Sequence, residues 1–411
     1  MSARLQKDAV LRQSFAVPVE FPVIFTRGLF DPANPVLLKA VRRMGERRRH
    51  RVAVFVDAGV WRAHPALARR IRAYFAAHTG ALELVAPPQR VPGGEKAKRD
   101  AALVGRLLAR FQAWRLCRHS FVVAVGGGAV LDAVGLAAAL FHRGLRLIRV
   151  PTTVLAQNDV GVGVKNAVNW RGVKNLVGTF SPPFAVLNDS DFLAALPDRD
   201  WIGGIAEAFK VALIRDARFF RWLSARASQL RARDRAAMEE LIRRCAALHL
   251  DHIRGGGDPF ETGRARPLDF GHWVAHKLEA MTGFRIGHGQ AVAIGLMLDS
   301  GYARRKGWLK AAELRAIRSG LLRSGFTLWH PALAARDGRG RLKILRGLED
   351  FREHLGGELW VTYPLGIGRR HEVGEVESAC VEECVRALSP GRRASARKAA
   401  TPRPQQIRSR M

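Results

Sequence analysis

The amino-acid sequence predicts an α/β protein in two parts, in which a domain built on parallel strands precedes an all-helical domain. Up to Leu196, short β-branched runs such as RVAVFVDAG and SFVVAVG alternate with helical patterns, which is typical of strands buried on both faces of a parallel sheet. After Leu196 the strand signal fades and long helical patterns follow one another. We therefore predict two domains, residues 1–196 and 197–388, with a boundary near Pro197.

The first half is expected to begin with one or two strands over residues 14–26, where apolar residues alternate with turn-formers. PANPVLLKAVRRMG then predicts a helix opened by a proline. RVAVFVDAG predicts a buried strand ending at Asp57, a position that suits a contact with a ribose hydroxyl in a nucleotide-binding domain. ALELV predicts the next strand. The helix after it begins at GGEKAK, where a solvated first turn is the simpler interpretation of Glu95 and Lys98.

A strand runs into three consecutive glycines in SFVVAVGGGAVLDAVGLAAAL, and an Ala-rich helix follows. Glycines at such a turn allow close approach to the backbone, and the free N–H groups at the start of the helix can bind phosphate. The pattern differs from G-x-G-x-x-G, and a tight packing turn is the alternative. We favour a pyrophosphate site at Gly126, Gly127 and Gly128.

The stretch LRLIRVPTTVLAQNDVGVGVKNAVNWRGVKNLVGTF predicts a strand followed by a long Gly-rich region with polar residues among apolar ones. Loops after strands carry binding sites in open α/β sheets. Asp159, Lys165, Lys174 and Asn175 are therefore candidates for substrate contact rather than core residues.

Three histidines lie close together in the second half, in RPLDFGHWVAHKLEAMTGFRIGHGQ. His272 and His276 are four residues apart on one face of an expected helix, and His288 follows in a glycine-bounded turn. Upstream, GGIAEAFK places Glu207 and Lys210 on one helical face inside an apolar run, where an unpaired carboxylate would be costly. A satisfied polar pair is the simpler interpretation of the two helical histidines, but one Glu with two His is the ligand set of a catalytic zinc.

The chain of 411 residues carries a formal net charge of +32, which suggests nucleic acid or a membrane surface as a partner. The positive residues are spread along the chain, although residues 389–411 hold seven Lys and Arg with no acid and are predicted to form a disordered basic tail. We therefore expect a basic enzyme with an anionic substrate, and no nucleic acid as primary partner.

Four scattered cysteines predict reduced thiols in a cytoplasmic protein, and no signal peptide is recognisable. The most apolar window, FVVAVGGGAVLDAVGLAAALF, contains three consecutive glycines and Asp132, which favours a buried strand and helix over a membrane span. We expect no membrane partner.

Five motifs follow one another along the chain: GGGAVLD, PTTVLAQNDVGVGVKN, GGIAEAFK, LDFGHWVAHKLE and HGQAVAIG. Together they resemble 3-dehydroquinate synthase and its relatives, the sugar phosphate cyclases, over about residues 50–370. The resemblance implies an NAD-binding α/β domain packed on a helical domain that binds zinc or cobalt. It also implies the reaction: NAD removes hydride from a substrate alcohol, phosphate leaves by elimination, the hydride returns, and an intramolecular aldol step closes a carbocycle.

The resemblance also assigns individual residues. The NAD contacts fall on Asp57, Glu95, Lys98, Gly127, Gly128, Asp132, Thr152 and Thr153. The metal ligands fall on Glu207, His272 and His288. The substrate and catalytic positions fall on Asp159, Lys165, Lys174, Asn175 and Lys210, with His276 as the proton-handling histidine. Arg143 matches the arginine that reaches the phosphate of the neighbouring subunit's substrate, which implies a homodimer.

The sequence departs from the synthase just before the first metal histidine. Ala265 and Asp269 stand where the synthase has an arginine and an asparagine that bind the substrate carboxylate, and Arg264 and Arg266 flank the gap. A carboxylate at position 269 would repel a carboxylated substrate. We therefore expect a divergent cyclase of secondary metabolism whose substrate is an uncarboxylated seven-carbon sugar phosphate, such as sedoheptulose 7-phosphate.

Two smaller departures are Asp251 and His252, where a lysine is expected, and Gln290 in HGQAV, where HGEAV is usual. Three alternatives remain open: an authentic 3-dehydroquinate synthase of the shikimate pathway, an iron- or zinc-type polyol dehydrogenase, and a basic binding protein without catalysis. The dehydrogenase would need an Asp in place of Glu207 and would lack the lysine pair of the Gly-rich region. The complete metal set argues against the binding protein.

Overall fold

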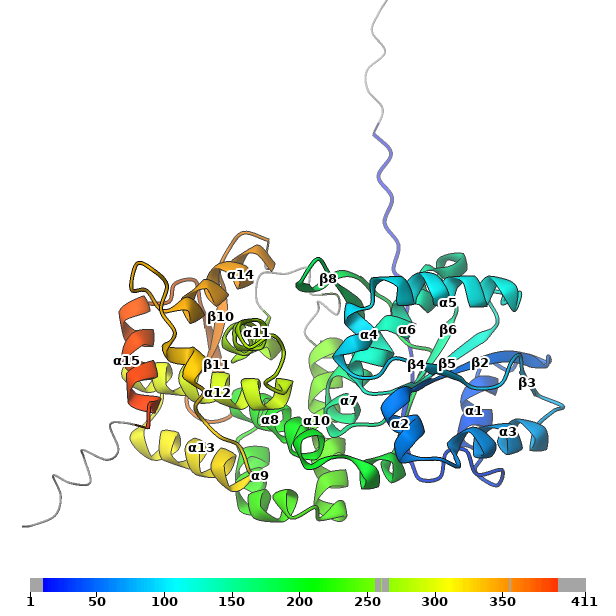
Figure 1. Ribbon diagram of the computed structural model, residues 1–411, viewed down its shortest axis with the longest axis horizontal. Helices are drawn as coiled ribbons and strands as arrows, with labels where there is room; N and C mark the ends of the chain where they lie inside the picture. The colour runs from blue at the N-terminus through cyan, green and yellow to red at the C-terminus, as the bar shows by residue number, and fades with distance from the viewer. Residues whose placement is uncertain (1–9, 256–259, 261–265, 355, 391–411) are drawn as a thin grey trace, which may run out of the picture.

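The computed structural model describes residues 10–255, 260, 266–354 and 356–390. The chain forms an α/β unit and a helical unit that lie side by side (Figure 1), which confirms the predicted fold class. Helix α8 (Asp198–Arg215) begins directly after Pro197, the proposed domain boundary. Of the predicted tail, residues 391–411 lie outside the described residues. Within the described part of the chain, no helix has the length and apolar character needed to cross a membrane.

A seven-stranded sheet forms the centre of the α/β unit, in the order β1-β9-β6-β5-β2-β3 with β4 also paired to β2, and all its pairings are parallel. Its strands are β1 (Val23–Thr26), β2 (His50–Asp57), β3 (Leu82–Leu84), β4 (Gln89–Val91), β5 (Phe121–Gly126), β6 (Arg146–Pro151) and β9 (Ala185–Asp189). The helices that cover its two faces are α1 (Val36–Arg42) and α3 (Leu67–Ala77) on one, and α5 (Ala101–Ala113) and α6 (Gly128–Leu140) on the other (Figure 1).

The central strands are apolar throughout because their side chains alternate between two cores. In β2, Val52, Val54 and Val56 pack in the core with α1 and α3, whereas Ala53 and Phe55 pack in the core with α5 and α6. Both faces of the sheet are therefore buried, as the continuous β-branched runs predict.

Three adjacent strands end at one edge of the sheet. Strand β2 ends at Asp57 and continues into α2 (Ala58–Ala63), and β5 runs through Gly127 into α6. Strand β6 leads into α7 (Val154–Asn158). Since β2, β5 and β6 are neighbours and parallel, their carboxyl ends meet where open α/β proteins bind ligands.

The helical unit places three helices at backbone contact. Its elements are α8, α9 (Ala217–Arg231), α10 (Arg235–Gly255), α11 (His272–Met281), α12 (His288–Arg305), α13 (Ala311–Arg323), α14 (Arg346–His354), α15 (Ser378–Leu388) and the antiparallel hairpin of β10 (Val361–Pro364) and β11 (Arg370–Val373). A Cβ atom on Gly289 would lie 2.0 Å from the carbonyl oxygen of Gly203, and one on Gly295 would lie 2.1 Å from that of Gly271. Helices α8 and α12, and the start of α11, therefore approach closely only because these positions carry no side chain.

The structure refines two local predictions. Of the one or two strands expected over residues 14–26 one forms, β1; Pro18 and Pro22 cannot donate a ladder hydrogen bond, and residues 10–20 are exposed and without regular structure. The Gly-rich region forms a hairpin of β7 (Lys165–Trp170) and β8 (Val173–Phe180). Its two turn residues both have positive φ, as in the type I′ turn that matches strand twist.

Candidate active site

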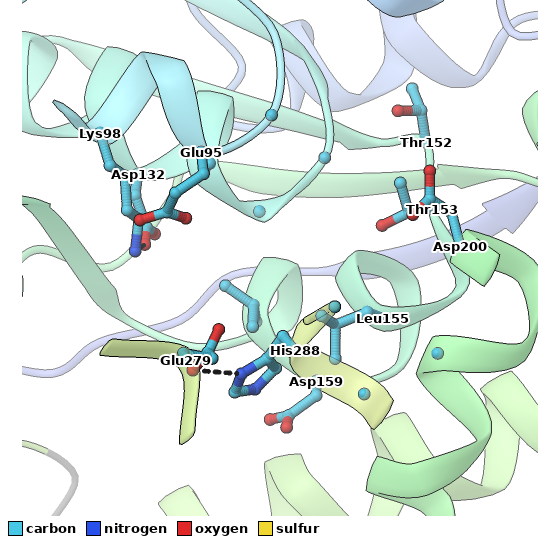
Figure 2. Close-up of a pocket in the computed structure, with 18 of the residues that line it drawn as sticks. Glu95, Lys98, Asp132, Thr152, Thr153, Leu155, Asp159, Asp200, Glu279 and His288 are labelled. Carbon is cyan, nitrogen blue, oxygen red and sulfur yellow. Dashed lines mark hydrogen bonds and ion pairs between the residues drawn. The ribbon is translucent and has the colours of Figure 1, made fainter. Parts of the chain in front are cut away.

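A cavity of 1570 Å³ is lined by residues of both units. It is lined by every expected NAD position: Asp57, Glu95, Lys98, Gly127, Gly128, Asp132, Thr152 and Thr153. It is also lined by the expected substrate and metal positions Asp159, Lys165, Lys174, Asn175, Lys210, His272, His276 and His288. Figure 2 shows Glu95, Lys98 and Asp132 on one side of this space and Glu279 and His288 across from them. Arg143 lies outside the cavity, in an exposed turn at positive φ.

Glu207 and two histidines form a group that could hold a metal ion. Helix α8 supplies Glu207, which is 1% exposed, while His272 and His288 are the first residues of α11 and α12. The Glu207 Oε1 atom lies 3.5 Å from His272 Nε2 and 3.4 Å from His288 Nε2. One ligand atom from each residue lies within 4.8 Å of the others. The set therefore has the composition and the spacing of a three-ligand metal site with an open position.

The other ring nitrogen of each histidine is engaged elsewhere, which fits this group to a metal. His272 Nδ1 lies 3.1 Å from the carbonyl oxygen of Phe270, and His288 Nδ1 lies 3.2 Å from Glu279 Oε2. A proton on Nδ1 leaves the Nε2 lone pair directed at Glu207, as in the carboxylate–histidine–metal arrangement. His276, Glu279 and His288 form a second possible group. It fits a metal less well because Lys174 contacts both oxygens of Glu279, whereas Lys210 contacts only Oε2 of Glu207 and leaves Oε1 facing the two histidines.

A buried chain of charges lies beside the metal group. Lys210 Nζ lies 2.6 Å from Glu207 Oε2 and 3.1 Å from Asp159 Oδ2, and His249 Nδ1 lies 2.8 Å from Asp159 Oδ1. Burial alone would lower the pKa of Lys210, but the carboxylates of Asp159 and Glu207 outweigh burial and raise it. Lys210 is therefore a fixed cation that orients Glu207 rather than a base.

The surroundings of His276 keep its ring neutral. Burial, assisted by the positive charge of Lys174, lowers the pKa of His276 well below its ordinary value. The ring is therefore neutral and can accept a proton at the cavity surface. Lys174 on β8 is held there by Glu279 on α11, with Nζ–Oε distances of 2.8 and 3.0 Å, so this ion pair joins the two units.

The opposite side of the cavity has the features of a dinucleotide cradle. The Asp57 carboxylate accepts hydrogen bonds from the backbone N–H groups of Gly59 (2.6 Å) and Gly94 (3.4 Å). A Cβ atom on Gly93 would lie 2.2 Å from Asp57 Oδ1, so only glycine leaves this carboxylate room. The turn at Gly127 opens the 13-residue helix α6 toward the cavity.

Lys98 does not lie in a solvated first turn. Its side chain is buried, forms an ion pair with Asp132 and donates a hydrogen bond to Asn175 Oδ1 at 2.8 Å. Glu95 accepts one from Asn169 Nδ2 at 2.6 Å. These contacts attach the helix of the GGEKAK motif to the β7–β8 hairpin, so the expected NAD positions and the expected substrate positions form one network.

The sequence reasoning missed four residues that hold this site together: the buried Glu279, Arg149 and Asp299, and the partly buried His249. Arg149 is fully buried and donates to the carbonyl oxygens of Gly161, Gly163 and Lys165 at 3.2, 2.7 and 2.8 Å, which fixes the segment leading to Lys165. The position of Glu279, three residues after His276 on one helical face, was a usable signal. His249, Arg149 and Asp299 gave none, because their partners are distant in sequence.

The residues that depart from the synthase pattern lie at the edge of the same cavity. Asp269 and Arg266 line it beside His272, whereas Ala265 and Arg264 lie outside the described residues. Burial would raise the pKa of Asp269, but the charge of Lys165, followed by those of His272 and Arg266, outweighs burial and lowers it. The cavity therefore presents a carboxylate at this position.

Asp299 on α12 fixes the start of α11 and should make stability depend on pH. It accepts hydrogen bonds from Gly271 N–H and Trp273 Nε1–H, both at 3.1 Å, on either side of His272. Burial raises the pKa of Asp299 from 3.8 to about 8 despite these bonds. As pH rises, Asp299 therefore loses its proton in the unfolded chain at lower pH than in the folded chain. The free energy of unfolding falls between about pH 4 and about pH 8, by at most about 1.4 kcal/mol per pH unit.

We predict that Asp299→Asn flattens this part of the stability curve. The measurement is the free energy of unfolding in urea between pH 5 and pH 8, with the exposed Glu353→Gln as control. The control should keep the slope of the unmodified protein. An Asp299→Asn variant with that same slope would contradict the assignment.

Comparison with known proteins places the chain in a family. The model of the 3-dehydroquinate synthase N-terminal domain matches residues 89–203, and that of the C-terminal domain matches residues 204–342. A 2-epi-5-epi-valiolone synthase of Streptomyces glaucescens is 35% identical over 366 residues, which cover 88% of this chain and 89% of that protein.

Solved structures agree with this placement. A 2-epi-5-epi-valiolone synthase from Streptomyces hygroscopicus with NAD+ and Zn2+ bound is 29% identical, with a TM-score of 0.80 over 92% of this chain and 99% of that chain. A 2-deoxy-scyllo-inosose synthase complexed with carbaglucose-6-phosphate, NAD+ and Co2+ is 24% identical and shares the fold, with a TM-score of 0.72 over 89% of this chain and 96% of that one. The chain therefore belongs to the 3-dehydroquinate synthase-like family of sugar phosphate cyclases.

Proposed function

We propose that the protein is an NAD- and zinc-dependent cyclase that eliminates phosphate from an uncarboxylated heptulose phosphate and closes a carbocycle. The observation that carries the proposal is the metal group of Glu207, His272 and His288, which opens into the same cavity as the dinucleotide cradle. The similarity to 2-epi-5-epi-valiolone synthases supports sedoheptulose 7-phosphate as the substrate. The reaction makes the enzyme a carbon–oxygen lyase acting on phosphates. The free cysteines suit a cytoplasmic enzyme.

Bound NAD would supply a reversible hydride acceptor, and bound zinc or cobalt would polarise the substrate oxygen. The residues of the chain do the remaining work. Lys210 stays charged and fixes Glu207 and Asp159, so the metal ligand and the cavity wall keep one geometry. His276 is neutral and accepts the proton released next to the reacting carbon.

The anionic phosphate of the substrate would lie against the β7–β8 hairpin. Lys165, Lys174 and Asn175 line the cavity there and supply two cations and an amide. Positive groups held in place near the departing phosphate stabilise the negative charge that develops on it. Arg143 is exposed and outside the cavity, which suits an arginine that completes the phosphate site of a second copy in a homodimer.

The assay that tests this function is phosphate release by the purified chain with NAD and zinc. The panel should contain sedoheptulose 7-phosphate, the carboxylated precursor of dehydroquinate, and glycerol. Release of inorganic phosphate with a cyclic product from the first substrate supports the proposal. Accumulation of NADH with glycerol and no phosphate release would instead identify a polyol dehydrogenase.

We predict that the unmodified protein has the higher kcat/KM with the uncarboxylated substrate. The reason is the ionised Asp269 at the cavity wall, because a substrate carboxylate brought next to it would be repelled by a like charge. The double variant Ala265→Arg with Asp269→Asn should shift the kcat/KM ratio toward the carboxylated substrate by about tenfold or more, since ~1.4 kcal/mol is sufficient.

The conservative control is Asp269→Glu, which keeps the charge and should keep the preference. If the unmodified protein turns over the carboxylated heptulose with the better kcat/KM, the inference from Asp269 is wrong and the chain acts as a 3-dehydroquinate synthase.

A further inference from the structure

A second, smaller cavity lies at the carboxyl end of α8, outside the catalytic cavity. It has a volume of 330 Å³ and is lined by Ile214, Arg215, Gly368, Arg369, Arg370 and Glu372. We call it the arginine pocket. Three arginines and one glutamate among six lining residues give it a formal charge of +2 (three minus one).

Carboxylates neutralise these arginines only in part in the described part of the chain. Arg370 Nε pairs with Glu372 at 3.0 Å, and Arg215 Nη1 lies 2.7 Å from His252 Nδ1. No ion pair joins Arg215 or Arg369 to an acidic side chain of the described residues. Burial, followed by repulsion from the charge of Arg370, lowers the pKa of Arg215, and the opposing charge of Asp251 does not fully offset these two effects. An anion between them would remove that repulsion.

The backbone that carries Arg369 and Arg370 is held against α8 before any ligand arrives. The Gly368 N–H donates to the carbonyl oxygen of Leu213 at 2.7 Å, which ties the β10–β11 hairpin to α8. A Cβ atom on Gly368 would lie 2.4 Å from the backbone nitrogen of Ala217, so the hairpin also contacts α9 directly. A pocket whose backbone is fixed in advance has less entropy to lose when it binds an anion.

We propose that the arginine pocket binds a phosphate dianion, either inorganic phosphate or the phosphoryl group of a small metabolite. Guanidinium groups bind tetrahedral oxyanions with paired hydrogen bonds, and the pocket has room for more than one phosphate group. The site goes beyond the proposed function and does not depend on it.

The pocket also communicates with the catalytic cavity. Arg215 lies on the helix that carries Glu207 and Lys210, and its partner His252 lines the catalytic cavity. Burial and the charge of Arg215 lower the pKa of His252 to about 4, so the neutral ring accepts the Arg215 hydrogen bond. An anion that draws Arg215 toward the pocket would release this bond at the cavity wall.

The test is equilibrium dialysis of the full-length protein, with NAD and bound zinc, against radiolabelled inorganic phosphate in physiological chloride. Arg215→Gln with Arg370→Gln is compared with a control pair of exposed arginines, Arg304→Gln with Arg315→Gln. Any phosphate that binds in the catalytic cavity binds equally in all samples and cancels in the comparison. The unmodified protein and the control should therefore bind one more phosphate per chain than the pocket variant.

A second variant separates a loss of phosphate binding from a loss of the folded structure. Arg369 is exposed, so Arg369→Gln should fold normally and weaken the additional site by roughly tenfold. Displacement of the additional phosphate by glucose 6-phosphate would identify a phosphomonoester as the ligand, and no displacement would identify inorganic phosphate. Unchanged stoichiometry and affinity in both pocket variants would overturn the proposal. Failure of the cyclase assay would leave this result unaffected.

Discussion

The His272→Ala variant is expected to lose its zinc and its turnover together. The proposed site has three protein ligands, and each histidine Nε2 is aligned by a hydrogen bond on the other side of its ring, so two remaining ligands would not hold the ion. Removing the polarising ion should lower kcat by a factor on the order of 10³ or more. Metal content by mass spectrometry and phosphate release from sedoheptulose 7-phosphate are the two measurements.

The control for this prediction is His119→Ala, an exposed histidine of the α/β unit, which should retain both zinc and activity. Glu279→Gln provides an intermediate case. It weakens the orientation of His288 without removing a ligand, and zinc affinity should fall by about 10- to 100-fold. Stoichiometric zinc in His272→Ala would show that the ion binds elsewhere, with the group of His276, Glu279 and His288 as the next candidate.

The Gly289→Ala variant is expected to disrupt the metal site without touching a ligand. Its new methyl group would lie 2.0 Å from the Gly203 carbonyl oxygen, and backbone on both sides leaves no flexible side chain to move. Helices α8 and α12 must therefore separate, which moves Glu207 away from His288. Overpacking of this kind costs about 1–3 kcal/mol, and a displacement of ~1 Å at a catalytic centre can cost 100-fold in rate.

A matched control lies on the same helix. A Cβ atom on Gly301 would first meet Cys384 Sγ at 3.7 Å, an ordinary contact, so Gly301→Ala should leave zinc binding and turnover unchanged. Thermal unfolding, zinc content and kcat should be measured for both variants. Normal kcat in Gly289→Ala would mean that the helices adjust without moving the ligands.

The fold was largely predictable because each central strand is buried on both faces, which leaves a continuous apolar run in the sequence. Asp57 and Gly127 could be assigned to the binding edge because parallel strands end together. Of the one or two strands expected over residues 14–26 only β1 forms, because alternation is also produced by an exposed segment interrupted by prolines. Alternation alone does not show that a partner strand is available.

The candidate site was predictable only where residue types and motifs carry chemistry. Glu207 and His272 are 65 residues apart (272 minus 207), and the family motifs rather than any spacing brought them together. Glu279 was missed because a glutamate on a helix is usually solvated, and only the structure shows it between Lys174 and His288. Asp299 was missed because it lies on α12, whereas the N–H groups that donate hydrogen bonds to it belong to Gly271 and Trp273 at the start of α11.

Because Lys174 is paired with Glu279, an anion that binds Lys174 must compete with the Glu279 carboxylate. A phosphate that approaches Lys174 does not meet a bare cation, but one already neutralised by a carboxylate at 2.8 Å. The binding free energy of the phosphate at Lys174 is therefore the difference between the free energies of the phosphate–Lys174 and Glu279–Lys174 ion pairs. A singly charged anion gains little by replacing Glu279. Glu279 also contacts His288, so an anion that binds Lys174 would change the surroundings of a proposed metal ligand.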